Sequence, residues 1–161
     1  MATSGKNLSS YDPGTIPPAG ALKIAIVVSE WNEQVTGPLS EGARTTLIQH
    51  GVKPENLLVQ YVPGSFELPI GARFLIDSFH PDAVILIGCV IRGETPHFDF
   101  ISQAVAQGCM QLGLETGIPV IFGVLTTNNL EQALDRAGGR HGNKGTEAAV
   151  TAIRMASLKN S

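Results

Sequence analysis

Four short apolar runs, separated from one another by stretches with helical spacing, constrain the fold of this sequence more than any other feature. The runs are KIAIVVS (23–29), NLLVQYV (56–62), AVILIGCVI (83–91) and PVIFGVLT (119–126). Their short length and β-branched residues are typical of strands covered on both faces. The remaining sequence predicts helices over 37–51, 67–79 and 96–117, a short helix in NLEQALDRAGG and a last one in GTEAAVTAIRMASL. This alternation predicts a single-domain α/β fold, a three-layer α/β/α sandwich around a four-stranded, parallel, doubly wound sheet.

Small residues in two of these helices predict close packing. Gly108 lies on the apolar face of the helix over 96–117, so we expect that face to approach the sheet closely. In the last helix, Ala148, Ala152 and Ala156 recur every four residues, which favours tight packing against another element.

Residues 1–20 mix Gly, Pro and Ser without periodicity, which predicts a flexible N-terminal arm in front of a domain over 21–158. Such an arm can add a strand to a neighbouring subunit. Pro13, Pro17 and Pro18 oppose strand pairing, so the sequence leaves both outcomes open.

The composition narrows the class of protein. A formal net charge of -3 gives no electrostatic footprint for nucleic acid or an anionic membrane. No apolar run approaches the roughly 18 residues of a membrane span, and the first twenty residues lack the apolar core of a signal peptide, so we expect a cytoplasmic protein. Cys89 and Cys109 lie inside apolar patterns and are predicted to be reduced core residues.

Charged residues make up only 16% of the chain, against about 25% in average soluble domains. A small domain with so few charges must expose apolar surface or cover it with copies of itself. The composition therefore predicts a homo-oligomer.

Polar or aromatic segments follow each predicted strand: SEWNEQ, PGSFELP, RGETPHFD and TTNN. Ligands of open parallel sheets bind outside the carboxyl ends of the strands, so these segments are the candidate site. Trp31, in the first segment, can stack on a planar heterocycle, or it can be a partly buried packing residue. In the second, Glu67 can accept hydrogen bonds from ligand hydroxyls; alternatively, Glu67 complements a helix dipole and Ser65 is a helix cap.

The third segment predicts a helix start that binds an anion. If Thr95 is the N-cap and Pro96 the first helical residue, His97 lies beside free N–H groups at the positive end of the helix dipole. That field favours a neutral imidazole, so His97 can act as a general base next to a phosphate. The alternative is that His97 is an ordinary surface residue at a helix start.

The Gly-rich segment RAGGRHGNKG (136–145) supplies further cations. Arg136, Arg140, His141 and Lys144 suit a phosphate, or they belong to a solvated basic loop. The chain has neither G-x-G-x-x-G nor G-x-x-x-x-G-K-[ST], which weakens dinucleotide and kinase hypotheses. No His or Cys pair has metal-ligand spacing, so we expect no metal site.

Five segments together resemble the lumazine synthase family: WN after the first strand, PGSFELP, GCVIRGETPHFDF, FGVLTTNNLEQAL and RAGGRHGNKG. The likeness covers about residues 20 to 158, with every segment in order. It implies a flavodoxin-like fold and the penultimate step of riboflavin biosynthesis. In that step 5-amino-6-(D-ribitylamino)uracil and 3,4-dihydroxy-2-butanone 4-phosphate condense to 6,7-dimethyl-8-ribityllumazine, phosphate and water, without a metal or redox cofactor.

The resemblance also implies residue roles. His97 transfers protons, and Glu94, Thr95 and Arg136 bind the phosphate of the butanone substrate. The residues implied to bind the ribitylaminouracil are Trp31, Ser65, Phe66, Glu67, Cys89, Val90, Ile91 and Phe122. Phe122 and Arg136 match positions that the family contributes from a neighbouring subunit.

The family resemblance implies a homopentamer. The absence of an insertion in RAGGRHGNKG resembles members that assemble twelve pentamers into an icosahedral shell of 60 subunits, in which riboflavin synthase is a possible partner. Two rival hypotheses stay open: a flavodoxin-like domain that binds a flavin, and a shell or storage protein without catalysis.

Overall fold

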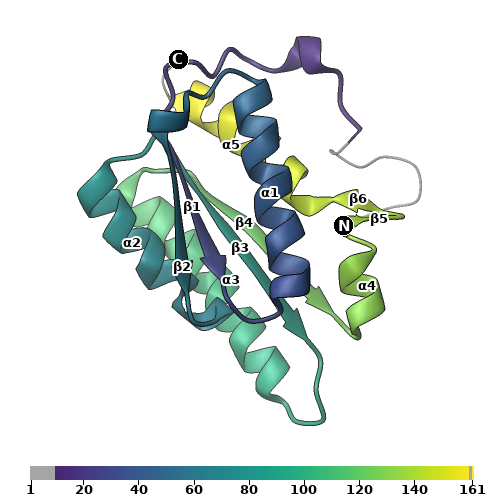
Figure 1. Ribbon diagram of the computed structural model, residues 1–161. Helices are drawn as coiled ribbons and strands as arrows, with labels where there is room; N and C mark the ends of the chain where they lie inside the picture. The colour runs from purple at the N-terminus through teal and green to yellow at the C-terminus, as the bar shows by residue number, and fades with distance from the viewer. Residues whose placement is uncertain (1–9, 160) are drawn as a thin grey trace.

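The computed structural model describes residues 10–159 and 161, and a four-stranded parallel sheet forms its centre. The strand order is β2-β1-β3-β4, and Figure 1 shows the strands fanned side by side between the helices. The strands are β1 (Ile24–Ser29), β2 (Leu57–Val62), β3 (Ala83–Ile91) and β4 (Val120–Thr127). All six residues of β1 are buried, as the apolar run predicts. The predicted parallel α/β fold is confirmed.

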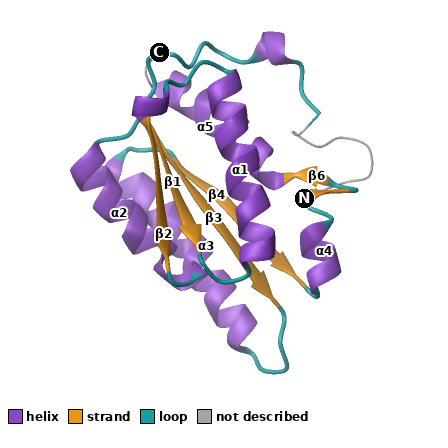
Figure 2. Cartoon of the chain, in the orientation of Figure 1, coloured by secondary structure: helices purple, strands orange, loops and turns teal. Residues whose placement is uncertain are grey.

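Helices cover both faces of the sheet (Figure 2). The α-helices are α1 (Glu33–Gln49), α2 (Leu68–Phe79), α3 (His97–Thr116), α4 (Leu130–Leu134) and α5 (Lys144–Lys159). Short 3-10 turns cover Pro13–Thr15 (η1), Pro54–Asn56 (η2) and Ser65–Glu67 (η3). α1 and α5 pack together on one face of the sheet, while α2 and α3 lie on the other.

Alternation along the strands divides the core into two apolar layers. Ile24, Ile26 and Val28 of β1 belong to the layer beneath α1 and α5. Ala25 and Val27 belong to the layer beneath α2 and α3. The sheet is therefore buried between two layers of helices, and its strand ends are the part that ligands can reach.

Two predicted packing details have different outcomes. Ala148, Ala152 and Ala156 are all buried, as their spacing predicts. Gly108 was predicted to let its helix approach the sheet, but it faces another helix instead. A Cβ there would lie 2.9 Å from Cγ of Pro69, on α2. Gly108 therefore allows close contact between two helices.

The predicted start of α1 is also wrong. The helix begins at Glu33, whereas Gly37 and Pro38 had suggested a start at residue 37. Pro38 lies inside the helix and exposed, and the turn at Asn32 starts the helix earlier by offering its carbonyl to the N–H groups of Val35 and Thr36.

The Gly-rich segment before α5 is not an irregular loop. It contains an antiparallel pair, β5 (Ala137–Gly139) and β6 (Gly142–Asn143), which Figure 1 places beside the N-terminal end of α5. Gly138 and Gly142 have φ values of 114° and 74°, a left-handed region that glycine adopts without strain. The hairpin gives the cations of this segment fixed positions.

The described part of the N-terminal segment lies against its own domain. Ile16, Ala19 and Leu22 are buried in the core, and the Ala19 N–H donates to the His50 carbonyl oxygen at 3.3 Å. Residues 10–22 contain no strand. The first nine residues of the predicted arm lie outside the described residues, and strand addition to a neighbour stays a prediction.

Over the described part of the chain, no helix combines the length and apolar character needed to cross a membrane.

Candidate functional site

A cavity of about 610 Å³ opens at the carboxyl ends of β1, β2 and β3. It brings together the turn after β1, the 3-10 turn before α2, the end of β3 and the start of α3. The sequence-predicted residues that line it are Trp31, Ser65, Phe66, Glu67, Cys89, Val90, Ile91 and His97. Three segments far apart in the sequence thus form one site, where a parallel sheet is expected to hold its ligand.

The turn after β1 presents Trp31 to the cavity. Its side chain is 72% exposed, so it is not a buried packing residue. Asn32, which follows it, has a left-handed backbone, and its Nδ2 group donates to the Cys89 carbonyl oxygen at 2.9 Å. That bond ties the turn to β3 and keeps the indole at the cavity mouth.

The 3-10 turn before α2 supplies a hydroxyl, an aromatic ring and a carboxylate. Ser65 is buried, and its hydroxyl has no hydrogen-bond partner among the described residues, so the alternative that Ser65 caps a helix is wrong. Phe66 is 57% exposed, and a Cβ at Gly64 would lie 3.0 Å from Glu67 Oε2. The carboxylate of Glu67 therefore lies over Gly64 at the cavity wall. The buried Ser65 hydroxyl is able to hydrogen-bond a ligand in the cavity.

β3 extends past its neighbour β1. The pairing of the two strands ends at Val28 and Ile87, while β3 continues to Ile91. The backbone of Cys89, Val90 and Ile91 therefore borders the cavity on a side where β1 no longer covers it. Burial raises the pKa of the Cys89 thiol to about 11, so near neutral pH this side chain is a neutral thiol and a poor nucleophile.

His97 is the first residue of α3 and lines the cavity. The N-cap is Pro96, not Thr95 as predicted, and it makes no side-chain capping bond. The N–H groups of Asp99 and Phe100 instead donate to the Pro96 carbonyl oxygen, at 3.0 and 3.4 Å. A proline N-cap has no side-chain acceptor, so the first two N–H groups of α3, those of His97 and Phe98, are open to an anion.

Arg92 spans the loop that leads to His97. Its guanidinium donates to both carboxylate oxygens of Asp99, at 2.9 and 3.4 Å, and its Cζ lies 4.2 Å from the centre of the Phe98 ring. Glu94 and Thr95 lie exposed in this loop, outside the set of residues that line the cavity. The two predicted phosphate ligands therefore lie in the loop between Ile91 and His97, which both line the cavity, but outside the lining itself.

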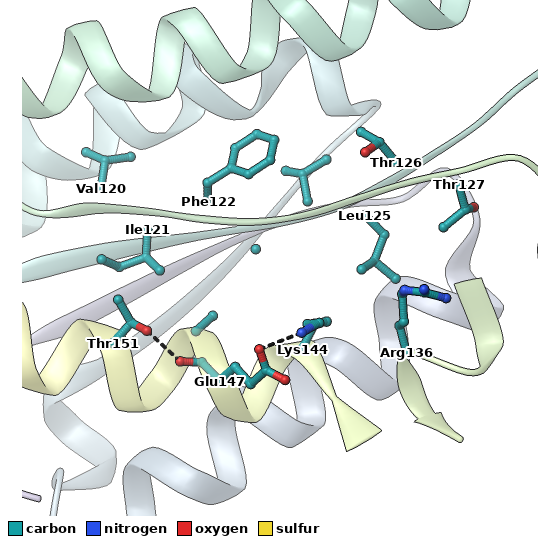
Figure 3. Close-up of a pocket in the computed structure, with 13 residues that line it drawn as sticks. Val120, Ile121, Phe122, Leu125, Thr126, Thr127, Arg136, Lys144, Glu147 and Thr151 are labelled. Carbon is teal, nitrogen blue, oxygen red and sulfur yellow. Dashed lines mark hydrogen bonds and ion pairs between the residues drawn. The ribbon is translucent and has the colours of Figure 1, made fainter. Parts of the chain in front are cut away.

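A second cavity, of about 510 Å³, lies along β4 and α5 and shares no lining residue with the first. Phe122, Arg136, Lys144 and Glu147 line it. Figure 3 shows Phe122 on the opposite side of β4 from the paired Lys144 and Glu147. Within one chain, Phe122 and Arg136 are thus separate from the cavity of Trp31 and His97.

The charges near the hairpin divide into paired and available groups. Lys144 Nζ lies 2.7 Å from Glu147 Oε2, and Arg140 pairs with Asp135, whose pKa it lowers through the hydrogen bond. Arg136 donates to the Gln132 carbonyl oxygen at 2.9 Å and forms no ion pair with the described residues. Arg136 is therefore the cation of this segment best able to bind an added anion.

The sequence predicted only part of the lining of the two cavities. Asn32 and Ile101 line the first cavity and Glu147 the second. The pair WN pointed to Asn32, but its left-handed backbone depends on the turn geometry. As for metals, the residues described include no group of three or more His, Cys, Asp or Glu side chains suited to hold an ion.

Comparisons with known proteins agree on one family. A family model described as 6,7-dimethyl-8-ribityllumazine synthase matches residues 21–160. Synthases of that name from Porphyromonas gingivalis and Phocaeicola vulgatus are 55% and 57% identical to this chain over 159 residues, covering 99% of this chain and 99% and 95% of theirs. A third, from Parabacteroides distasonis, is 57% identical over 155 residues, covering 96% of this chain and 97% of its own.

Proposed function

The chain belongs to the 6,7-dimethyl-8-ribityllumazine synthase family, and from this premise we propose that it is a transferase of riboflavin biosynthesis that makes this lumazine. Its substrates are 5-amino-6-(D-ribitylamino)uracil and 3,4-dihydroxy-2-butanone 4-phosphate, called butanone phosphate below. The observation that carries the proposal is the cavity at the strand ends, which gathers eight of the residues that the family resemblance predicts.

The ribitylaminouracil binds in this cavity. Trp31 stacks on the pyrimidine ring, which its exposed indole permits, and Phe66 adds a second exposed apolar surface. The unpaired hydroxyl of Ser65 donates a hydrogen bond to the ligand, and the Glu67 carboxylate accepts hydrogen bonds from the ribityl hydroxyls. The uncovered backbone of Cys89, Val90 and Ile91 recognises the ring edge; one acceptor there, the Cys89 carbonyl, is already engaged by Asn32.

The butanone phosphate binds at the start of α3. The open N–H groups of that helix favour an anion, and in the preceding loop Glu94 completes the contact through its backbone N–H and Thr95 through its N–H and hydroxyl. Arg136 supplies the positive charge. Its separation from His97 within the chain supports a site to which a neighbouring subunit contributes Arg136 and Phe122.

The chemistry requires orientation and proton transfer. The amine of the pyrimidine condenses with the ketone to an imine and releases one water. Phosphate then leaves, and the ribitylamino nitrogen closes the ring with loss of a second water. Holding two substrates in a reactive geometry can contribute about 7 to 11 kcal/mol in favourable intramolecular models. His97 moves protons between the reacting atoms, which typically adds about 10²- to 10⁴-fold.

The assembly is a ring of five in which β4 and the adjoining helices face the next subunit. An apolar cavity of about 600 Å³ supports this, because Met110, Leu114 and Leu158 line it while their side chains are 65%, 78% and 66% exposed. We place the protein in the cytoplasm, with twelve rings forming a 60-subunit shell and riboflavin synthase as a possible partner. Light scattering distinguishes a pentamer from a shell by mass.

The first test mixes the purified protein with both substrates and follows lumazine formation by absorbance and fluorescence. An enzyme-free control is needed because the substrates can condense unaided. We expect a protein-dependent rate that falls when Arg136 is changed to Ala. No acceleration by an intact oligomer would instead favour a catalytically inactive shell, and tight co-purification of a yellow flavin without condensation would favour a flavin-binding domain.

A further inference from the structure

The side-chain amide of Asn143 joins three parts of the fold. Its Oδ1 accepts hydrogen bonds from the N–H groups of Gly145 and Thr146, at 2.8 and 3.3 Å, which caps the start of α5. Its Nδ2 donates to the carbonyl oxygen of Pro38, on α1, at 3.0 Å. These bonds fix the orientation of the amide, because only its oxygen can accept hydrogen bonds from the two N–H groups and only its nitrogen can donate to the carbonyl.

Two glycines make room for this amide. A Cβ at Gly42 would lie 2.5 Å from Asn143 Oδ1, and a Cβ at Gly145 would overlap the Leu39 carbonyl oxygen. The N-terminal end of α5 therefore lies directly against the backbone of α1, with no room for a side chain at Gly145. The Asn143 side chain lies in this contact and is held by its bonds to Gly145, Thr146 and Pro38.

The same residue lies next to two cations that line the second cavity, the one along β4 and α5, called the β4 cavity below. Asn143 pairs with Ala137 across the β5–β6 hairpin, so Arg136 and Lys144 directly flank the pair. The Lys144 N–H donates to the Arg136 carbonyl oxygen at 2.9 Å, which fixes the backbone positions of these two residues relative to each other. Both side chains line the β4 cavity, and Asn143 does not.

We propose that Asn143 is a positioning residue that anchors the hairpin to α1 and thereby sets the location of Arg136 at the phosphate of the butanone substrate. This inference rests on the proposed function. Asn143 touches neither substrate. It acts through the hairpin, because without the bond to Pro38 the cations can shift together by rotation of the hairpin about the α5 cap.

The test is Asn143→Ser, which keeps a short capping oxygen for α5 and removes the bond to α1. We expect KM for butanone phosphate to rise about ten-fold, because small displacements of positioned groups can cost up to about 10² in rate. We expect KM for the ribitylaminouracil to change less than about two-fold, since that substrate's cavity contains no residue of the hairpin. A general loss of stability would not separate the two KM values.

Thr46→Val is the matched control. Thr46 is also buried between α1 and α5, and its hydroxyl donates to the Gly42 carbonyl oxygen at 2.7 Å and contacts the Thr146 hydroxyl at 3.3 Å. We expect it to leave both KM values unchanged. If Asn143→Ser fails to fold, Gly42→Ala, whose new methyl group must displace the same amide, is expected to give the same selective rise.

Three outcomes would overturn the inference: an unchanged KM for butanone phosphate in the folded variant, an equal rise for both substrates, or the same rise in Thr46→Val. The proposed function fails separately, if the unaltered protein does not accelerate lumazine formation.

Discussion

Asn32 adopts a left-handed backbone, with φ of 61° and ψ of 43°, at the point where β1 ends and α1 begins. This conformation costs an ordinary L residue about 1–2 kcal/mol, and asparagine tolerates it better than most. The hydrogen bond from its side chain to the Cys89 carbonyl oxygen stabilises the turn by about 0.5–1.5 kcal/mol. Together they hold Trp31 over the cavity.

Two substitutions separate these contributions. Asn32→Gly loses the side-chain bond but keeps the backbone conformation easily, whereas Asn32→Ala loses both advantages. We expect the free energy of unfolding to fall in both variants, and to be about 1 kcal/mol lower in Asn32→Ala than in Asn32→Gly. Chemical denaturation measures it; equal stabilities would mean that the turn does not depend on a left-handed residue.

His97 is the residue on which proton transfer depends in the proposed mechanism. We expect His97→Ala to lower kcat about 10²-fold without abolishing turnover, because orientation of the two substrates remains. Steady-state kinetics measures this, with light scattering as the control for assembly. Complete loss of activity in a correctly assembled variant would show that His97 does more than transfer protons.

At the scale of elements, the sequence predicted the strands and most helices because apolar periodicity is local. The predicted third strand, 83–91, agrees with the structure in both bounds. Three features were not predictable from local patterns. The early start of α1 depends on the backbone of Asn32, the β5–β6 hairpin depends on contact with α1 through Asn143, and the true partner of Gly108 is a proline on another helix.

The contact of α2 with α3 allows a test of that last point. A methyl group at Gly108 would lie 2.9 and 3.0 Å from two carbons of the Pro69 ring, which is too close without movement of a helix. Overpacking of this kind typically costs about 1–3 kcal/mol, which exceeds the gain of about 1 kcal/mol from alanine in a helix. We therefore expect Gly108→Ala to lower the thermal midpoint.

Pro69→Ala is the second arm of a double-mutant cycle. In its background the ring is absent, so Gly108→Ala should become neutral or stabilising. The cycle measures the coupling between the two positions directly. A coupling near zero would mean that the two helices adjust without strain.

At the scale of the whole molecule, one chain divides the candidate site into two parts. The strand-end cavity holds His97, the β4 cavity holds Arg136, and the two share no residue. The sequence could predict that Trp31, Ser65 and His97 gather in one cavity, because their segments follow strands whose carboxyl ends meet at one edge of the sheet. It could not predict from local pattern that Arg136 lies in a different cavity, since that depends on where β4 and α5 pack relative to the strand ends.

This division predicts complementation between subunits. His97→Ala and Arg136→Ala are each expected to form poorly active rings alone. If every site combines His97 of one subunit with Arg136 of the next, unfolding and reassembling an equal mixture restores both groups in about a quarter of the sites, since each needs the two variants in one order. Activity should then exceed the mean of the two variants assembled separately.

Mixing the assembled variants without unfolding is the control, and it should show no gain. If the reassembled mixture also shows no gain while affinity capture through a tag on one variant recovers the other, which confirms mixed rings, both residues act within one chain, and the shared site is wrong.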